Sequence, residues 1–117
     1  MSRVSRILAA ASLLTLTAGA ALADCPHSRF RFGYRGDHVP VMLKSDGTCT
    51  LSWRMRGVST ISEAEIAAPP HHGTAVASLT GVRYAGRGAN DDRFSVRVCG
   101  TGRAGPGCST LDVTVVQ

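Results

Sequence analysis

The chain has 117 residues with a formal net charge of +5, and 44% of its residues are hydrophobic. This length predicts a single domain, and the hydrophobic share excludes a chain too polar to fold. Removing the first 23 residues, which contain Arg3 and Arg6, leaves a charge of +3, so the rest of the chain is only mildly basic. Outside the N-terminus no apolar run approaches the roughly 20 residues of a membrane span.

The first 23 residues have the pattern of a secretory signal. Residues 1–6 carry two arginines and no acid, and residues 7–22 are uncharged and mostly Ala, Leu and Thr. Ala21-Leu22-Ala23 then supplies the small-x-small pattern of a signal-peptidase site. We therefore expect export, cleavage of residues 1–23, and a mature domain of residues 24–117 without a transmembrane segment. Because Asp24 separates the cleavage site from Cys25, no lipid is expected on Cys25.

Alternation of apolar and polar residues with a period of two recurs through the mature chain, whereas helical periodicity does not. Strands are predicted at residues 30–34, 39–43, 49–55, 73–79, 81–84, 94–98 and 111–115. Residues 58–67 fit neither period, so one helical turn is left open there, and Pro69-Pro70 stops any helix. About seven short strands divided by turns, without crossover helices, predict an all-β, antiparallel β-sandwich. Its core is expected to contain Leu51, Trp53, Tyr84, Phe94, Val96 and Val113.

Export determines how the four cysteines are interpreted. In an oxidising compartment an even number in a small domain predicts two disulfides, and four cysteines allow three connectivities. Cys99 ends one alternating stretch, Cys108 begins the next, and the glycine-rich residues between them are typical of a turn. This predicts a Cys99–Cys108 bond at the base of a loop and, by elimination, Cys25–Cys49. The alternatives, a redox pair or a zinc site, lack a C-x-x-C motif and a histidine at zinc-finger spacing.

The second half of the chain carries an ordered series of motifs. Pro70-x-x-Gly73-Thr74 is followed by Gly81-x-x-Tyr84, by Asp92-x-Phe94-x-Val96-x-Val98, and by Leu111-x-Val113-x-Val115. Over residues 58–117 this resembles bacterial immunoglobulin-like domains of the cadherin-like and tandem-repeat adhesin type, and in layout small single-domain exported proteins of alphaproteobacteria. The resemblance implies an immunoglobulin-like fold, but the functions of such domains vary. The chain departs from the pattern at Asn90, where the family usually has glycine, and in having cysteines.

Two polar clusters are weak candidates for a metal site. Asn90, Asp91 and Asp92 offer two carboxylates and one amide, whereas calcium needs six to eight oxygens, so a solvated turn is favoured. Asp92 also precedes a predicted strand and can accept hydrogen bonds from nearby loop amides. His71 and His72 point apart on an extended chain, so a copper or zinc site would need His27 or His38 brought near by folding. We expect no metal and no cofactor.

Arginines alternate with aromatic residues in the segment Ser28–Arg35. In a cytosolic protein this pattern suggests RNA binding, but export makes nucleic acid an unexpected partner. The remaining functional hypothesis is that Arg29, Arg31 and Arg35 contact an anionic surface, such as lipopolysaccharide, acidic polysaccharide or phospholipid headgroups. The favoured interpretation is an amphipathic strand with its aromatic rings inward and its arginines in water.

Catalysis has little support in the sequence. Glu63 and Glu65 would share one face of a strand, but no acid–base partner, no G-x-S-x-G motif and no free cysteine is indicated. We expect a non-catalytic module that binds a protein or glycan in the cell envelope or outside the cell. The alternative is a structural or stress-related envelope protein without a specific ligand, and the lesser alternative is a metal-binding protein or an enzyme.

Overall fold

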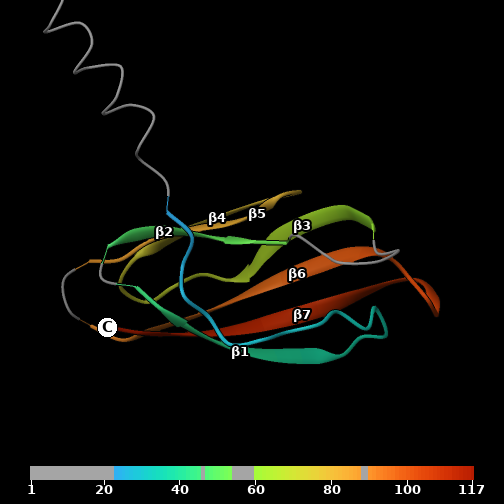
Figure 1. Cartoon of the computed structure of the whole chain (residues 1–117), viewed down its shortest axis with the longest axis horizontal. Coiled ribbons are helices and arrows are strands. Elements are labelled where there is room, and N and C mark those ends of the chain that lie inside the picture. Colours follow the sequence, from blue (N-terminus) through green and yellow to red (C-terminus); the bar gives the residue numbers. More distant parts are fainter. Residues whose placement is uncertain (1–22, 46, 54–59, 88–89) are drawn as a thin grey trace, which may run out of the picture.

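The computed structural model describes residues 23–45, 47–53, 60–87 and 90–117 (Figure 1). The predicted signal lies outside the described residues except for Ala23, and so does Met55, the last apolar residue of the strand predicted at 49–55. Within the described chain no helix could cross a membrane.

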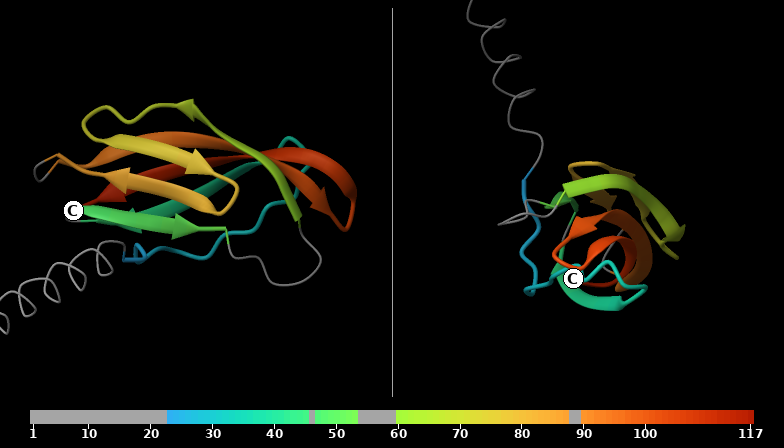
Figure 2. Two further views of the ribbon diagram at one scale, coloured as in Figure 1. Left: turned by 90° about the horizontal axis from the view of Figure 1, so that it is seen from above. Right: turned by 90° about the vertical axis from the view of Figure 1, so that its right-hand side faces the viewer.

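The described chain is all-β and forms two sheets, as the alternation predicts. Its seven strands are β1 (His38–Lys44), β2 (Thr48–Ser52), β3 (Thr60–Ala68), β4 (Thr74–Ser78), β5 (Gly81–Ala85), β6 (Asp92–Gly102) and β7 (Gly105–Val116). One sheet has the order β1-β7-β6-β3 and the other the order β2-β5-β4. The two sheets form the layers of a sandwich-like structure (Figures 1 and 2).

The core lies between the two sheets and confirms the predicted core residues. Leu51, Trp53, Tyr84, Phe94, Val96 and Val113 are each at most 2% exposed. Tyr84 of β5 and Phe94 of β6 stack across the interface, with ring centroids 5.6 Å apart and ring planes 2° from parallel. Because these two strands belong to different sheets, the stacked pair joins the layers directly.

Both predicted disulfides are present. Cys25–Cys49 ties the N-terminal segment to β2, and Cys99–Cys108 links register partners of β6 and β7. The sequence predicts a turn throughout the glycine-rich stretch between Cys99 and Cys108. In the structure most of this stretch is strand, because the pairing of β6 with β7 continues to Gly102 and Gly105. A side chain at Gly100 would collide with the Thr60 carbonyl oxygen, so this glycine marks a close approach of strands rather than a turn.

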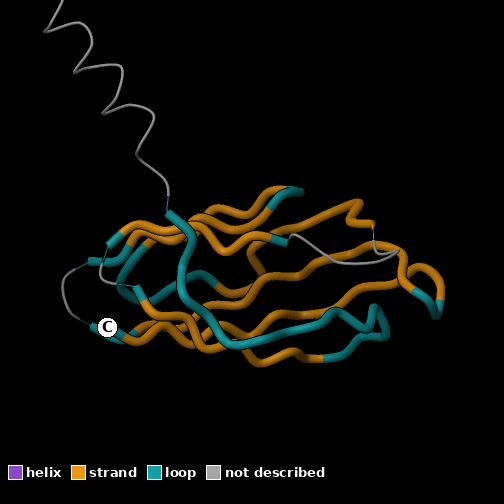
Figure 3. Tube along the Cα trace, viewed as in Figure 1, coloured by secondary structure: helices purple, strands orange, loops and turns teal. Residues whose placement is uncertain are grey.

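The strand prediction for residues 30–34 is wrong, although the burial it implies is correct. This stretch is a loop (Figure 3), yet Phe32 and Tyr34 are buried while Arg29 and Arg31 are exposed. Alternating polarity reports which side of the chain faces the core, and a loop lying along a sandwich has the same two sides as a strand.

Residues 60–68 resolve the ambiguity left by the sequence, because they form β3 and not a helical turn. The register of β3 against β6 shifts twice, between Ile61 and Glu63 and again between Ile66 and Ala68. Each irregularity interrupts the period of two, which explains why the alternation is hidden in the sequence.

The antiparallel prediction also needs a correction, because β1 runs parallel to β7, from the pair His38–Thr110 to the pair Lys44–Val116. The other strand pairs are antiparallel. The alternation of apolar and polar residues is the same in parallel and antiparallel strand pairs. The long connection between β1 and β7 permits both kinds of pairing, so the sequence could not decide between them.

Candidate functional site

The N-terminal segment, residues 23–37, contains the arginine-rich residues and lies along one side of the sandwich, where its residues 23–28 bridge the two sheets. Thr50 of β2 exchanges backbone hydrogen bonds with it, through Cys25 N to Thr50 O at 3.0 Å and Thr50 N to Ala23 O at 2.9 Å. On the other sheet, Lys44 N donates to Pro26 O and Ser28 N donates to Met42 O, both at 2.9 Å. Together with Cys25–Cys49, these bonds hold the segment against both β1 and β2 (Figure 2).

The aromatic residues of this segment point inward and form a cluster with the single tryptophan. Phe32 lies 5.6 Å from Trp53 and 5.9 Å from Tyr34, measured between ring centroids, and Phe30 lies 5.5 Å from Phe32. Phe32 and Tyr34 are buried and Phe30 is half-buried. The favoured interpretation of the sequence, rings inward and arginines in water, is therefore the arrangement in the structure.

Arg29, Arg31 and Arg35, which we call the basic strip, are all exposed. Within the described residues the ion pairs involve only His38, Arg97 and their carboxylate partners, so none of the three guanidinium groups is neutralised by a neighbouring acid. Arg29 and Arg31 are two residues apart, a spacing of about 7 Å along an extended chain. The basic strip is thus a set of positive charges without an ion pair in the described part of the chain, on a segment held at both sheets.

A polar cluster around Asp37 sets the position of Arg35. The chain turns at Tyr34 (φ 57°) and Gly36 (φ 73°), and the Asp37 carboxylate accepts hydrogen bonds from Gly33 N at 3.1 Å and Arg35 N at 3.0 Å. Ser109 of β7 donates its hydroxyl to the same carboxylate at 2.7 Å. Burial raises the pKa of Asp37, but these hydrogen bonds outweigh burial and lower it.

One arginine at the same end of the molecule was not predicted from the sequence to belong to the site. Arg103 is exposed at the tip of the β6–β7 hairpin, next to Gly102, whose missing side chain leaves room for the Tyr34 ring. Its position beside the residue that contacts the Tyr34 ring depends on the pairing of β6 with β7 and on the fold of the N-terminal segment, which no local pattern could indicate.

Asp92 is not part of a solvated turn, because it is 4% exposed and begins β6. Its carboxylate accepts hydrogen bonds from the backbone amides of His71 at 2.7 Å and Gly73 at 2.8 Å, and from the Tyr84 hydroxyl at 2.9 Å. The amides of His72 and Arg93 also donate to it. The predicted capping of loop amides is found, but the loop lies about twenty positions away in the sequence and connects β3 to β4. Asp92 therefore joins that loop to β5 and β6.

This environment shifts two pKa values in opposite directions. Burial alone raises the pKa of Asp92, but the hydrogen bonds from Gly73, Tyr84, His71 and Arg93 together hold it well below its usual range. Burial, followed by the hydrogen bond to Asp92 and its negative charge, raises the pKa of Tyr84 to about 12. Both shifts favour the ionised carboxylate and the neutral phenol, which is the arrangement that the hydrogen bond requires.

We expect the free energy of unfolding to be highest between about pH 5 and pH 9. The stabilisation by Asp92 is complete above its unfolded pKa of about 4 and is lost as the pH falls through the lower folded value. The stabilisation by Tyr84 is complete below about pH 10 and is lost as the pH rises through about 12. Urea unfolding from pH 2 to pH 11 tests this, with Tyr84→Phe expected to flatten the alkaline decrease. A wild-type free energy that stays constant from pH 5 to pH 2 would contradict it.

The other metal candidates do not converge in the structure. His71 and His72 are exposed, and their backbone amides bind Asp92. His27 lies opposite Leu43, at the far end of β1 from His38, so these two histidines are about 16 Å apart along the strand. Asn90 and Asp91 instead hold the C-terminal residue, with Gln117 Nε2 donating to Asn90 O at 2.9 Å. Among the described residues no group of three His, Cys, Asp or Glu side chains could hold a metal ion.

One further cluster on the outer face of the four-stranded sheet contains serine, aspartate and histidine. Ser95 Oγ donates to Asp112 Oδ1 at 3.0 Å, and His38 Nδ1 lies 2.9 Å from Asp112 Oδ2. A nucleophilic triad needs the histidine between the serine and the acid, so that it can take the hydroxyl proton. Here the aspartate lies between them, so this cluster cross-links β6, β7 and β1 and does not form a triad.

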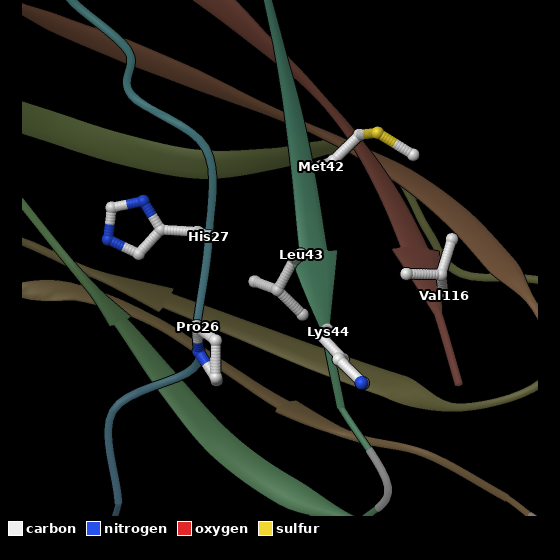
Figure 4. A pocket seen from close by; sticks show the side chains of 6 residues that line it. All are labelled: Pro26, His27, Met42, Leu43, Lys44 and Val116. Atoms are coloured by element: carbon white, nitrogen blue, oxygen red, sulfur yellow. The ribbon is translucent and has the colours of Figure 1, made fainter.

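A shallow groove lies where the N-terminal segment meets the end of β1 (Figure 4). Its lining is mostly apolar and consists of Pro26, His27, Met42, Leu43, Lys44 and Val116. Figure 4 shows these side chains spread over three segments and not directed at a common point. The groove lacks the converging polar groups of an enzyme site, and it lies outside the basic strip.

No family model, no curated protein and no solved structure matches this chain. The candidate site is therefore defined by the geometry above, and its strongest feature is the basic strip.

Proposed function

We propose that the protein is an exported, non-catalytic, immunoglobulin-like module that binds an acidic polysaccharide through Arg29, Arg31 and Arg35. The observation that carries this proposal is the exposure of three guanidinium groups that have no acidic partner among the described residues, on a segment anchored to both sheets. Guanidinium groups form charge-assisted, often bidentate hydrogen bonds with carboxylates and sulfates, and a row of them matches a polymer of repeated negative charges.

The orientation of the aromatic residues favours a polysaccharide over a membrane. Phe32 and Tyr34 are buried, and the half-buried Phe30 packs against Phe32, so no aromatic side chain of the segment is fully exposed for insertion into a bilayer. The same packing leaves no fully exposed aromatic platform for stacking on nucleobases. Recognition by the basic strip is therefore electrostatic, and it should weaken as salt increases.

Export and the immunoglobulin-like class are supported by features of both the structure and the sequence. The two disulfides are compatible with an oxidising compartment. Seven described strands in two facing sheets fit the architecture that the motifs of residues 58–117 imply. A structural envelope protein without a ligand remains the competing function, and it predicts no saturable binding.

Binding of polygalacturonate to the full chain, expressed with export and purified in its oxidised form, tests the proposal. We expect saturable binding that weakens at high salt, and we expect Arg29→Ser, Arg31→Ser and Arg35→Ser together to reduce affinity about tenfold, at about 0.5 kcal/mol for each exposed charge. The matched control replaces Arg83, Arg87 and Arg93, which are also exposed, with serine. Equal losses in both triple variants would indicate a general charge effect, and no binding by the wild-type protein would end the proposal. Binding to anionic vesicles but not to the polysaccharide would overturn the assigned ligand.

A further inference from the structure

The four strands at the edges of the two sheets differ in how well they are protected against pairing with another chain. The N-terminal segment covers β1, through the bridge between His27 and Leu43, and it covers β2, through the bridge between Asp24 and Thr50. The edge strand β3 carries two exposed acids, Glu63 and Glu65, and its register is irregular. Charges and bulges are the usual protections of an edge against pairing with another chain.

The fourth edge strand, β4, contacts β3 of the other sheet, but it has no paired segment, charge or bulge along its outer edge in the described chain. It ends its sheet, and no described strand pairs with its outer edge. Residues 74–80 contain no ionisable side chain and no proline, and the register of β4 against β5 is regular. Val76 is 64% exposed and Leu79, in the following turn, is 57% exposed, so β4 and its turn carry two of the three exposed large hydrophobic residues of the described chain.

The sequence of β4 is nearly the same when it is read in reverse. Thr74-Ala75-Val76-Ala77-Ser78 has Val76 at its centre, alanine on both sides, and a hydroxyl residue at each end. A two-fold axis through Val76 would therefore place Val76 opposite its counterpart, Ala75 opposite Ala77, and Thr74 opposite Ser78. A C2 interface requires this kind of self-complementary surface, and antiparallel strands provide it.

The charge distribution also permits this pairing at β4 and opposes it at β3. Around Ala64, antiparallel pairing of two β3 strands would place Glu63 of one copy opposite Glu65 of the other, and like charges directly opposite each other are destabilising. At β4 the exposed charge in register with Val76 is that of Arg83 on β5. Across the axis the two Arg83 positions would be three strand spacings apart, about 14 Å, which exceeds the Debye length of about 8 Å at physiological salt.

From these observations we propose that β4 is a self-association edge, at which a second copy of this chain adds its own β4 in antiparallel orientation about Val76. The pairing joins two three-stranded sheets into one six-stranded sheet, and it leaves the basic strip of each copy free. A five-residue strand buries much less than the roughly 1,200–2,000 Å² of a standard interface, so the dimer is weak and forms at high protein concentration.

Sedimentation equilibrium of the oxidised full chain over a wide concentration range tests the dimer. We expect a reversible monomer–dimer equilibrium, and Val76→Lys should weaken it at least about tenfold, because two lysines would face each other across the axis. Val76→Thr keeps an uncharged β-branched side chain and should stay within about twofold of wild type. Met42→Lys, a charge at an exposed residue of the covered edge β1, should have no effect. A protein that is monomeric at every concentration, or a dimer that Val76→Lys does not weaken, overturns the proposal.

Cross-linking tests the register separately. Val76→Cys should give a covalent dimer under mild oxidation, since the two positions are directly opposite. Position 79 is also exposed, but in Leu79→Cys the cysteine is displaced from its counterpart by six positions, about 20 Å, so this variant should remain monomeric. Peptide mapping verifies that Cys25–Cys49 and Cys99–Cys108 are intact in both variants. Covalent dimers from Leu79→Cys but not from Val76→Cys would exclude the Val76 axis.

Discussion

Asp92→Ala is expected to lower the free energy of unfolding by at least about 3 kcal/mol at pH 7. The carboxylate is 4% exposed and accepts hydrogen bonds from four backbone amides and the Tyr84 hydroxyl. Its removal leaves these donors without their acceptor, and each buried unsatisfied group costs about 1–3 kcal/mol. Since a domain of this size is stable by only about 5–15 kcal/mol, a large part of its stability depends on this one side chain. Urea unfolding measures the loss.

Two matched variants test whether the loss of stability is specific to the buried Asp92 carboxylate. Asp91→Ala removes the neighbouring acid, which is exposed, and should change stability by no more than about 0.5 kcal/mol. Tyr84→Phe removes one of the five donors but keeps the ring stacked on Phe94, so it should cost about 1 kcal/mol. If Asp92→Ala were no more harmful than Asp91→Ala, the loop from β3 to β4 would not depend on Asp92.

Loss of the Cys25–Cys49 disulfide is expected to destabilise the protein by about 3.5 kcal/mol, and loss of Cys99–Cys108 by about 2.7 kcal/mol. The difference follows from the lengths of chain that the bonds close, because their sequence separations are 24 and 9 residues. Double alanine variants and urea unfolding test the order. Removing Cys25–Cys49 should also weaken polysaccharide binding, since this bond anchors the segment that carries the basic strip.

Non-reducing peptide mapping of the native protein checks the pairing on which these values rest. A Cys49–Cys99 bond would refute the pairing. If losing Cys99–Cys108 lowered the free energy of unfolding more than losing Cys25–Cys49, local packing around the bonds would outweigh the entropy of the unfolded chain.

Alternation in the sequence predicted most of the core, because burial on one face is a local property of each strand. Leu51, Phe94, Val96 and Val113 all face inward as expected. The same signal could not separate strand from loop at residues 30–34, because alternation reports which residues face the core and not which backbone groups pair. It also failed at β3, where two irregularities in register disturb the period.

The partners in the polar contacts that organise the molecule were not predictable, because these contacts join distant parts of the chain. The donors to Asp92 lie mostly in the loop from β3 to β4, and Ser109 reaches Asp37 from β7. In the sequence both aspartates look like ordinary turn residues. The basic strip, by contrast, was visible as a pattern, but its lack of acidic partners became evident only when the surrounding strands were in place.

We propose that the basic strip is the binding surface of this disulfide-linked sandwich. An amide-resolved NMR titration of the oxidised protein with polygalacturonate is the sharpest test of this binding surface. We expect the shifted resonances to concentrate in residues 27–37 and at Arg103, with the β4 and β5 amides unchanged. Shifts centred on β4 and β5, or no shifts at saturating polysaccharide, would contradict it.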